Sequence, residues 1–345
     1  MTTRWVVVLA GGVGSRFWPL STPARPKQLL PLVDDRPLLV ATVDRLASLV
    51  PAAQTLVLTN STLRDTVSAH LPTVPAENII AEPRAVGTGG ALAWGASEIE
   101  RRAGPDAVML SIHADWAIGD DAGFRAALEN AATVAERTGS LVTVGVVPTR
   151  PDTGFGYIRP GEPMLDGAYR VERFVEKPDR NAAERMVAEG CLWNSGIFAW
   201  RVGDFLSEVR ALTPELAPAL EAANGDAERY FAKATPVTVD VGVLERSRRV
   251  AVIPGSFGWD DVGTWASLAR VRQRDARGNA ASGPVVLVDS NDNVVHAEGA
   301  DVVLYGVHDL VVVTRGGLTL VTTRDQAADL KTLIAALPER LRDRP

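Results

Sequence analysis

The chain has 345 residues, a formal net charge of −6 and a single cysteine, Cys191. This length predicts a large α/β unit with a smaller appendage. The acidic balance, without any basic block, excludes a general nucleic-acid-binding surface. One cysteine excludes an intrachain disulfide. The sequence also has no signal-peptide pattern and no apolar run of the roughly 20 residues that span a bilayer, so we expect a cytoplasmic protein.

Short apolar runs alternate with helix-like segments through the first two thirds of the chain. Strands are predicted over residues 5–9, 55–59, 108–112 and 141–147, and helices over 44–49, 91–102 and 124–137. This alternation is typical of an α/β domain with a mostly parallel sheet. We expect this domain to cover residues 1–275.

The last part of the sequence changes character after residue 278. Strands are predicted over residues 284–289, 293–296, 302–305, 310–314 and 318–322, followed by a helix over 325–337. Short strands with tight turns and no intervening helix favour a small β-solenoid or β-roll module. We expect this module to cover residues 280–345.

A glycine-rich turn follows the first predicted strand. Gly11, Gly12 and Gly14 allow a sharp turn whose N–H groups can cradle anionic oxygens. Arg16 then supplies a forked donor for phosphate, and Lys27 supplies a compact charge in a proline-rich stretch. A turn without a ligand would explain the glycines alone but not two cations beside them. Neither the Walker pattern nor the dinucleotide fingerprint fits.

The turn and its flanks resemble the sugar-nucleotide pyrophosphorylases, whose pattern is GGxGxRxxP followed by PKQ or PKP. FWPLS at 17–21 and PKQ at 26–28 are most similar to the mannose-1-phosphate guanylyltransferase branch. The resemblance implies a Rossmann-like (GT-A-like) nucleotidyltransferase with a mixed, mostly parallel sheet and a small left-handed β-helix-like C-terminal domain. It implies that this loop binds the nucleotide through Leu9, Ala10, Gly11, Gly12, Gly14, Ser15 and Arg16.

Two aspartates are candidates for holding a divalent cation. Asp115 follows the predicted strand 108–112, at the sheet edge where open α/β sheets bind ligands, and Asp261 lies in FGWDDVGTW. Mg²⁺ prefers one or two carboxylates together with substrate phosphates. As the alternative, these aspartates cap a turn and a helix starting near Val262. The family motifs favour Asp115 and Asp261 as ligands, with Asp260 at a variable position.

Three later segments are candidates for holding a sugar phosphate: TGFGYI, FVEKP and LWNSGIF. Gly156 would let the backbone approach a sugar ring, while Glu176 and Asn194 can bond its hydroxyls and Lys177 can pair with its phosphate. Each segment alone also reads as ordinary strand or core. Their order matches the family, and the WNSGIF form again resembles the mannose-1-phosphate branch.

The base-binding segment departs most from the family pattern EPxxRNTAPA. Glu82 is the expected reader of the guanine N–H donors, with Gly87 and Thr88 beside it. The chain has glycines where Asn, Ala and Pro are usual, and its GTGGAL piece is similar to pyrophosphorylases acting on other bases. The choice of nucleotide therefore stays open here, as does the alternative that the glycines merely open the helix 91–102.

The resemblance implies GMP transfer from GTP to mannose 1-phosphate, with GDP-mannose and pyrophosphate as products and Mg²⁺ as cofactor. We expect Arg16, Lys27 and Lys177 to be catalytic through positioning and charge neutralisation. Two alternatives are a pyrophosphorylase for another hexose or heptose 1-phosphate or another nucleotide, and a non-catalytic sugar-nucleotide-binding paralogue. An isomerase fusion is disfavoured because no cupin-like domain follows. Exposed strand edges in the C-terminal module lead us to expect a homodimer.

Overall fold

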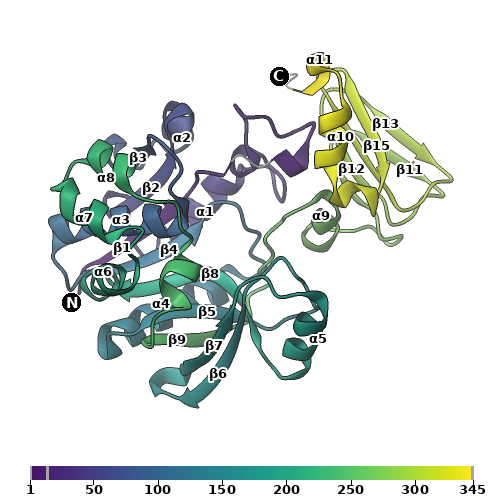
Figure 1. The fold of residues 1–345 in the computed structure, drawn as a ribbon. Coiled ribbons are helices and arrows are strands. Elements are labelled where there is room, and N and C mark those ends of the chain that lie inside the picture. Colours follow the sequence, from purple (N-terminus) through teal and green to yellow (C-terminus); the bar gives the residue numbers. More distant parts are fainter. Residues whose placement is uncertain (1, 13–14, 343–345) are drawn as a thin grey trace. The chain divides into compact units, whose positions relative to one another are not determined.

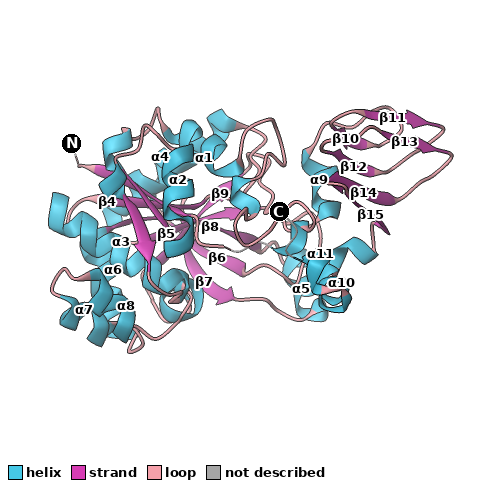
Figure 2. Cartoon of the chain, turned by 90° about the horizontal axis from the view of Figure 1, so that it is seen from above, coloured by secondary structure: helices cyan, strands magenta, loops and turns pink. Residues whose placement is uncertain are grey.

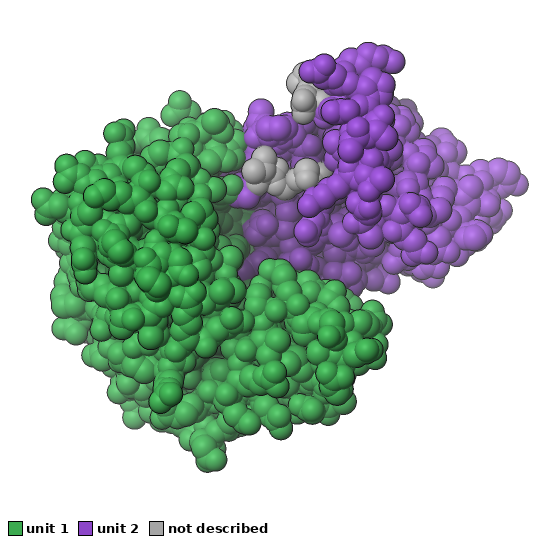
Figure 3. All heavy atoms as spheres, in the orientation of Figure 1, with its two compact units in different colours: residues 1–11, 43–114, 120–259 green, residues 12–42, 115–119, 260–345 purple. Residues whose placement is uncertain are grey.

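The computed structural model describes residues 2–12 and 15–342 (Figure 1). The chain divides into two compact units, each assembled from segments that are separate in the sequence. Unit 1 takes in residues 1–11, 43–114 and 120–259, and unit 2 takes in residues 12–42, 115–119 and 260–345 (Figure 3). The expected domains 1–275 and 280–345 divide the chain by sequence, and that boundary stays a prediction.

Unit 1 is built on a mixed sheet (Figure 2). In the described residues its strand order is β3-β2-β1-β4-β8-β5-β9-β7-β6. The strands are β1 (Arg4–Leu9), β2 (Thr55–Asn60), β3 (Ile79–Glu82), β4 (Val108–His113), β5 (Leu141–Val146), β6 (Tyr157–Pro163), β7 (Tyr169–Val175), β8 (Leu192–Arg201) and β9 (Val250–Gly255). The first four strands in that order run parallel, while β8 is antiparallel to β4 and β5. The four strands predicted for this part are confirmed as β1, β2, β4 and β5.

Helices connect these strands. They are α1 (Leu38–Leu46), α2 (Arg64–His70), α3 (Gly87–Ala103), α4 (Asp121–Thr138), α5 (Arg180–Ala188), α6 (Val202–Leu212), α7 (Ala217–Ala223) and α8 (Ala227–Lys233). The helix predicted at 44–49 is misplaced, because α1 begins after Pro37 and follows the buried face of Leu38, Leu39, Val43 and Leu46. Outside residues 1, 13–14 and 343–345, which are not described, no helix is long and apolar enough to cross a membrane.

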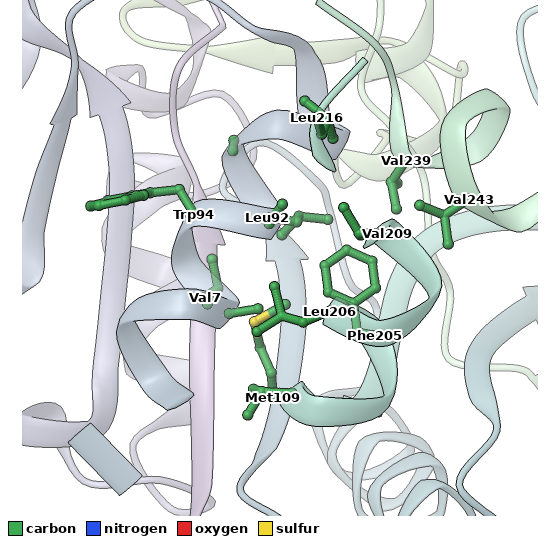
Figure 4. Packing of buried hydrophobic residues seen from close by; sticks show 14 of the residues in the cluster. Val7, Leu92, Trp94, Met109, Phe205, Leu206, Val209, Leu216, Val239 and Val243 are labelled. Atoms are coloured by element: carbon green, nitrogen blue, oxygen red, sulfur yellow. The ribbon is translucent and has the colours of Figure 1, made fainter. Parts of the chain in front are cut away.

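The core of unit 1 explains why β1 is almost continuously apolar. Val7 and Leu9 join the hydrophobic cluster that α3 and α6 cover, and Figure 4 shows Val7 with Leu92 and Phe205 in that packing. Successive strand residues face opposite sides, so Val6 and Val8 point to the other face, where they too are fully buried. Burial on both faces therefore accounts for the nearly continuous apolar sequence of β1.

Unit 2 carries what we call the C-terminal β module, residues 280–323. Its strands are β10 (Ala280–Ser282), β11 (Val285–Val288), β12 (Val294–Ala297), β13 (Val302–Tyr305), β14 (Leu310–Arg315) and β15 (Leu318–Thr323). β10, β12 and β14 pair in parallel, as do β11 and β13. The strands predicted between residues 284 and 322 are confirmed. Such repeated parallel pairing of short strands agrees with a β-helix-like module.

Three helices flank this module: α9 (Trp265–Val271), α10 (Leu330–Ala336) and α11 (Glu339–Arg342). The helix predicted at 325–337 is confirmed only in part, as a 3₁₀ turn (Gln326–Ala328) followed by α10: Asp329 interrupts the helix, and its side chain accepts from Thr332 N to start α10 afresh. The alternative helix starting near Val262 is also wrong. Thr264, not an aspartate, forms the capping box of α9.

Candidate active site

The predicted site residues fall into two groups, one in each unit, and each group is described within its own unit. Unit 1 contains Leu9, Ala10, Gly11, Glu82, Gly87, Thr88, Gly156, Glu176, Lys177 and Asn194. Unit 2 contains Gly12, Ser15, Arg16, Lys27, Asp115 and Asp261. Gly14 lies outside the described residues.

Lys27 is the buried cation of the unit 2 group. Only 7% of the residue is exposed, and it opens the single-turn helix η2 (Lys27–Leu29). Its Nζ lies 2.9 Å from Asp115 Oδ2 and donates to the Asp261 carbonyl oxygen at 2.5 Å. A buried ammonium is costly unless it is paired and hydrogen-bonded. The structure therefore brings Lys27 together with both acidic segments that the sequence singled out.

A short backbone pairing holds these acidic segments together. Ala117 and Asp260 exchange two hydrogen bonds, at 2.9 and 3.1 Å. The Asp260 carboxylate is committed to structure, because Arg270 binds it at 2.7 and 3.1 Å and Val262 N donates to it at 2.9 Å. This separates the two neighbouring aspartates: Asp260 fixes the turn, while Asp261 is the one whose backbone meets Lys27.

The turn after Asp261 is strained. Val262 has φ +46°, an unfavourable value for a β-branched residue, although its side chain is fully buried. At Gly263 a Cβ atom would come within 2.6 Å of Asp261 Oδ2. Glycine is thus required there for the carboxylate to keep its position. Strain of this kind costs about 1 to 3 kcal/mol and clusters at ligand sites.

Gly12 lies close to η2 within unit 2. Gln28 Nε2 donates to the Gly12 carbonyl at 3.0 Å, which ties the glycine-rich turn to the Lys27 helix. Arg16 lies on the single-turn helix η1 (Ser15–Phe17), and its side chain is exposed. Exposure leaves its guanidinium able to reach an anion.

Glu82 ends β3 in unit 1, in the segment that the sequence predicts to bind the base. Burial raises the pKa of its carboxyl to about 7. Among the described residues, no hydrogen bond or ion pair engages this carboxylate. A Cβ added at Gly11 would lie 3.4 Å from Glu82 Oε1, so Gly11 lies beside this carboxylate within unit 1. A half-buried acceptor without a donor is what a base with two N–H groups requires.

The glycines that depart from the family pattern have a packing role. α3 begins at Gly87, earlier than predicted, and a Cβ at Gly87 or Gly89 would come within 2.4 or 2.9 Å of the Val237 carbonyl oxygen. Thr88 Oγ1 accepts from Val239 N at 3.0 Å. The segment 237–239 therefore occupies space beside the start of α3, and the Thr88 hydroxyl binds it.

β8 carries a bulge at the predicted sugar-binding segment. Its pairing with β5 shifts between Thr143 and Gly145, which lie opposite Phe198 and Asn194. Ser195 Oγ donates to the Val144 carbonyl at 2.6 Å within this irregular stretch. Bulges often redirect side chains beside active sites. Here the Asn194 side chain is partly exposed, whereas its neighbours Trp193 and Ser195 are buried.

Gly156, Glu176, Lys177 and Asn194 do come together. Asn194 N donates to the Gly156 carbonyl at 2.8 Å, and a Cβ at Gly156 would lie 2.6 Å from Glu176 Oε2. Lys177 Nζ pairs with Glu176 Oε1 at 2.6 Å, and Lys177 has φ +47°. The group thus offers amide, carboxylate and ammonium around a glycine backbone, as a sugar phosphate needs.

Asp240 belongs to this group and was missed from the sequence. It opens the π-helix η7 (Asp240–Leu244), and its Oδ1 accepts from Asn194 Nδ2 at 2.8 Å. Burial and the nearby Glu176 charge raise its pKa to about 6. π-Helical turns are frequent at functional sites. The available signal was one acid inside the apolar run 237–244.

Two parts of the chain match models of known protein families. Residues 5–278 match the family model described as "Nucleotidyl transferase", and residues 283–337 match the "MannoseP isomerase/GMP-like beta-helix domain".

The chain belongs to the nucleotidyl transferase family.

Within this family it groups with the mannose-1-phosphate guanylyltransferases. It is 38% identical to the mannose-1-phosphate guanylyltransferase of Escherichia coli and 35% identical to that of Salmonella muenchen. Each match covers 95% of this chain and 72% of the relative. A crystal structure described as a mannose-1-phosphate geranyltransferase from Thermus thermophilus is 36% identical with a TM-score of 0.89, covering 97% of this chain and 99% of that one. The expected nucleotidyltransferase fold with a β-helix-like C-terminal domain is thereby confirmed.

Nucleotidyl transferases act on nucleotides and sugar phosphates and generally use a divalent cation. The residues in unit 2 fit such an ion. Asp115 and Asp261 supply hard oxygen donors, and both segments already meet one cation, the Lys27 ammonium. Two carboxylates with substrate oxygens suffice for Mg²⁺.

Proposed function

We propose that this chain transfers GMP from GTP to α-D-mannose 1-phosphate, forming GDP-mannose and releasing pyrophosphate. The observation that carries this proposal is its 35–38% identity, over 95% of its length, to relatives named for that activity. The proposal is also supported by side chains suited to bind the phosphates, the sugar and the base, which are assigned below.

In the proposed reaction an oxygen of the sugar phosphate attacks the α-phosphorus of GTP. A P–O bond forms there as the bond to the β-phosphate oxygen breaks, and the electron pair leaves with pyrophosphate. The nucleophile is already an anion, so no side-chain base is needed. The protein's contribution is positioning and charge neutralisation. We assign to Arg16 and Lys27 the stabilisation of the negative charge that develops on the α-phosphate and the pyrophosphate.

The sugar phosphate is assigned to the unit 1 group around Gly156. Glu176 and Asn194 bond the hydroxyls, while Lys177 neutralises the phosphate. Asn194 is held by Asp240 on one side and by Thr143 Oγ1, 3.0 Å away, on the other. Those two contacts fix which way the amide points. Gly196 N also donates to Asn194 Oδ1, at 3.3 Å, so the amide keeps its second N–H as a donor for the sugar.

The base is assigned to Glu82. Its half-buried carboxylate can accept from both N–H donors of guanine, which adenine does not offer in that arrangement. Leu9, Ala10, Gly11, Gly12, Gly14 and Ser15 complete the proposed nucleotide loop, with Gly87 and Thr88 at the start of α3. When bound to Asp115 and Asp261, Mg²⁺ would neutralise phosphate charge on both substrates.

Isotope exchange tests this assignment. Labelled pyrophosphate should enter GTP only when mannose 1-phosphate or GDP-mannose and Mg²⁺ are present, because no covalent enzyme intermediate is proposed. Exchange without the sugar substrate would contradict the direct displacement. Exchange into another nucleotide but not into GTP would contradict the base assignment. The expected homodimer is a separate prediction that sedimentation equilibrium can test.

A further inference from the structure

The loop that carries Lys27 has little regular structure of its own. Between residues 15 and 37 the structure describes the single-turn helices η1 and η2 and an isolated bridge between Thr22 and Arg25. The backbone hydrogen bonds between described residues of this loop are all local, joining residues no more than four positions apart. Contacts from elsewhere in unit 2 must hold the loop.

The apolar side chains of this loop share a core with the C-terminal β module. Phe17, Trp18, Leu20, Leu30 and Leu32 are buried in one cluster with side chains of β12, β14 and β15. The module residues of that cluster are Val294, Val311, Val313 and Leu320. A shared core of this kind fixes the loop against the module.

Arg315, which ends β14, binds the loop before Lys27. Its Nη1 donates to the Leu20 carbonyl at 3.0 Å and the Pro19 carbonyl at 3.3 Å. Only 15% of its side chain is exposed, and Glu298 Oε1 lies 3.6 Å from its Nε. Arg25 Nη1 also lies 3.4 Å from that glutamate oxygen. Two loop carbonyls and one loop cation are thus bound from the module.

Arg272, at the end of α9, binds the loop after Lys27. Its Nε donates to the Leu32 carbonyl at 2.6 Å, and Nη2 donates to His296 Nδ1 at 3.2 Å. Burial, then the Arg272 charge, lowers the pKa of His296 to about 4, so its Nδ1 is free to accept at neutral pH. The arginine therefore connects the loop to β12.

We propose that the C-terminal β module, together with Arg272 directly after α9, positions the Lys27 loop, and that Arg315 and Arg272 are the positioning residues. They bind backbone carbonyls on either side of Lys27, at Leu20 and at Leu32. Neither arginine is assigned a contact with substrate. This proposal rests on the catalytic role given to Lys27 above, but its structural part, that the module orders the loop, stands on its own.

The test compares Arg315→Met with Arg324→Met in the full chain. Arg324 directly follows β15, and its side-chain hydrogen bond and ion pair with described residues go to module groups, the Asp292 carbonyl at 3.4 Å and Asp309 Oδ1 at 3.9 Å. It is therefore a control for losing a module arginine without losing a loop contact. If Arg315→Met does not fold, Arg315→Lys, which keeps the charge, replaces it in the same test.

Two readouts are needed, hydrogen exchange of the loop amides and steady-state kinetics. We expect Arg315→Met to speed exchange at Leu29 and Leu30, and to lower kcat about tenfold to a hundredfold with little change in the KM for mannose 1-phosphate. Arg324→Met should leave both near wild type.

Unchanged loop exchange in Arg315→Met, or a kcat loss no larger than in Arg324→Met, would overturn the positioning role. Faster loop exchange in a protein inactive with GTP and mannose 1-phosphate would instead contradict the proposed function while supporting the structural part.

Discussion

Lys27 carries a buried ammonium group, which is paired and hydrogen-bonded by its neighbours. Its ammonium meets the Asp115 carboxylate and the Asp261 carbonyl. Replacing Lys27 with Ala should lower turnover by several hundredfold, since losing one preorganised charge contact costs roughly 3 to 4 kcal/mol of transition-state stabilisation. Pyrophosphate release measures this. Lys27→Met, which fills the space, separates charge from packing. Near wild-type turnover in Lys27→Met would show the assignment to be wrong.

Asp260 and Asp261 are neighbours with different expected roles. Asp261→Asn should raise the Mg²⁺ concentration needed for half-maximal rate and lower turnover by orders of magnitude. Asp260→Asn should instead weaken the pairing with Arg270 and lower the melting temperature, with less effect on the metal requirement. Metal titrations and thermal unfolding of both variants test this. The assignment fails if the two variants show the same metal dependence.

Glu82 links function to stability. Its folded pKa of about 7 is raised from 4.5, so the native state binds more protons between those pH values. The associated stability is full below pH 4.5 and is lost as pH rises through 7. Ionised Glu82 therefore costs on the order of 3 kcal/mol at pH 8. Glu82→Gln should unfold at a higher temperature than wild type at pH 8 and at about the same temperature at pH 4.5. A lower melting temperature at pH 8 would contradict burial as the cause.

The same substitution should impair use of GTP. Glutamine offers guanine one acceptor and one clashing donor, a loss of about 1 to 3 kcal/mol in kcat/KM for GTP. Discrimination between GTP and ATP should narrow, while the KM for mannose 1-phosphate changes little. Equal losses with both nucleotides would show that the base is read elsewhere, for example by the backbone around Gly87 and Thr88.

At the scale of elements, the π-helix η7 and the bulge in β8 together make the Asn194–Asp240 pair. Asp240→Asn would place two amides against each other, and we expect a tenfold or larger rise in the KM for mannose 1-phosphate. The double variant Asn194→Asp with Asp240→Asn restores one donor and one acceptor with their order reversed. If Asp240 acts by orienting its partner, the double variant should recover part of the loss. A double variant worse than both single ones would exclude that role.

Elements with strong local patterns were predictable from the sequence. The four predicted strands of unit 1 (β1, β2, β4 and β5) are apolar runs of the right length, and the module strands are separated by turn residues. β6, β7 and the bulge in β8 were not predicted, because half-exposed strands such as Tyr169–Val175 have weak apolar signals. α3 starts early at Gly87 although glycine disfavours helix, since packing against Val237 overrides local propensity.

At the scale of the whole molecule, the sequence motifs identified most candidate residues but not what holds them. Arg272 contacts the Leu32 carbonyl and Arg315 the Leu20 carbonyl across long stretches of sequence. No periodicity or motif marks such long-range contacts to backbone oxygens. The same limit applies to Asp240, whose partner Asn194 lies on another element. Candidate residues within a local motif could be named from the sequence, whereas the distant segments that contact them could not.

The central claim is the transfer of GMP from GTP to mannose 1-phosphate. The most direct measurement incubates the protein with Mg²⁺ and each pairing of GTP, UTP, dTTP, ATP or CTP with mannose or glucose 1-phosphate, and identifies products by mass spectrometry. We predict that GTP with mannose 1-phosphate gives GDP-mannose and an equal amount of pyrophosphate, at the highest kcat/KM of all pairings. A higher kcat/KM for another pairing, or no nucleotide sugar from any of them, would contradict the account.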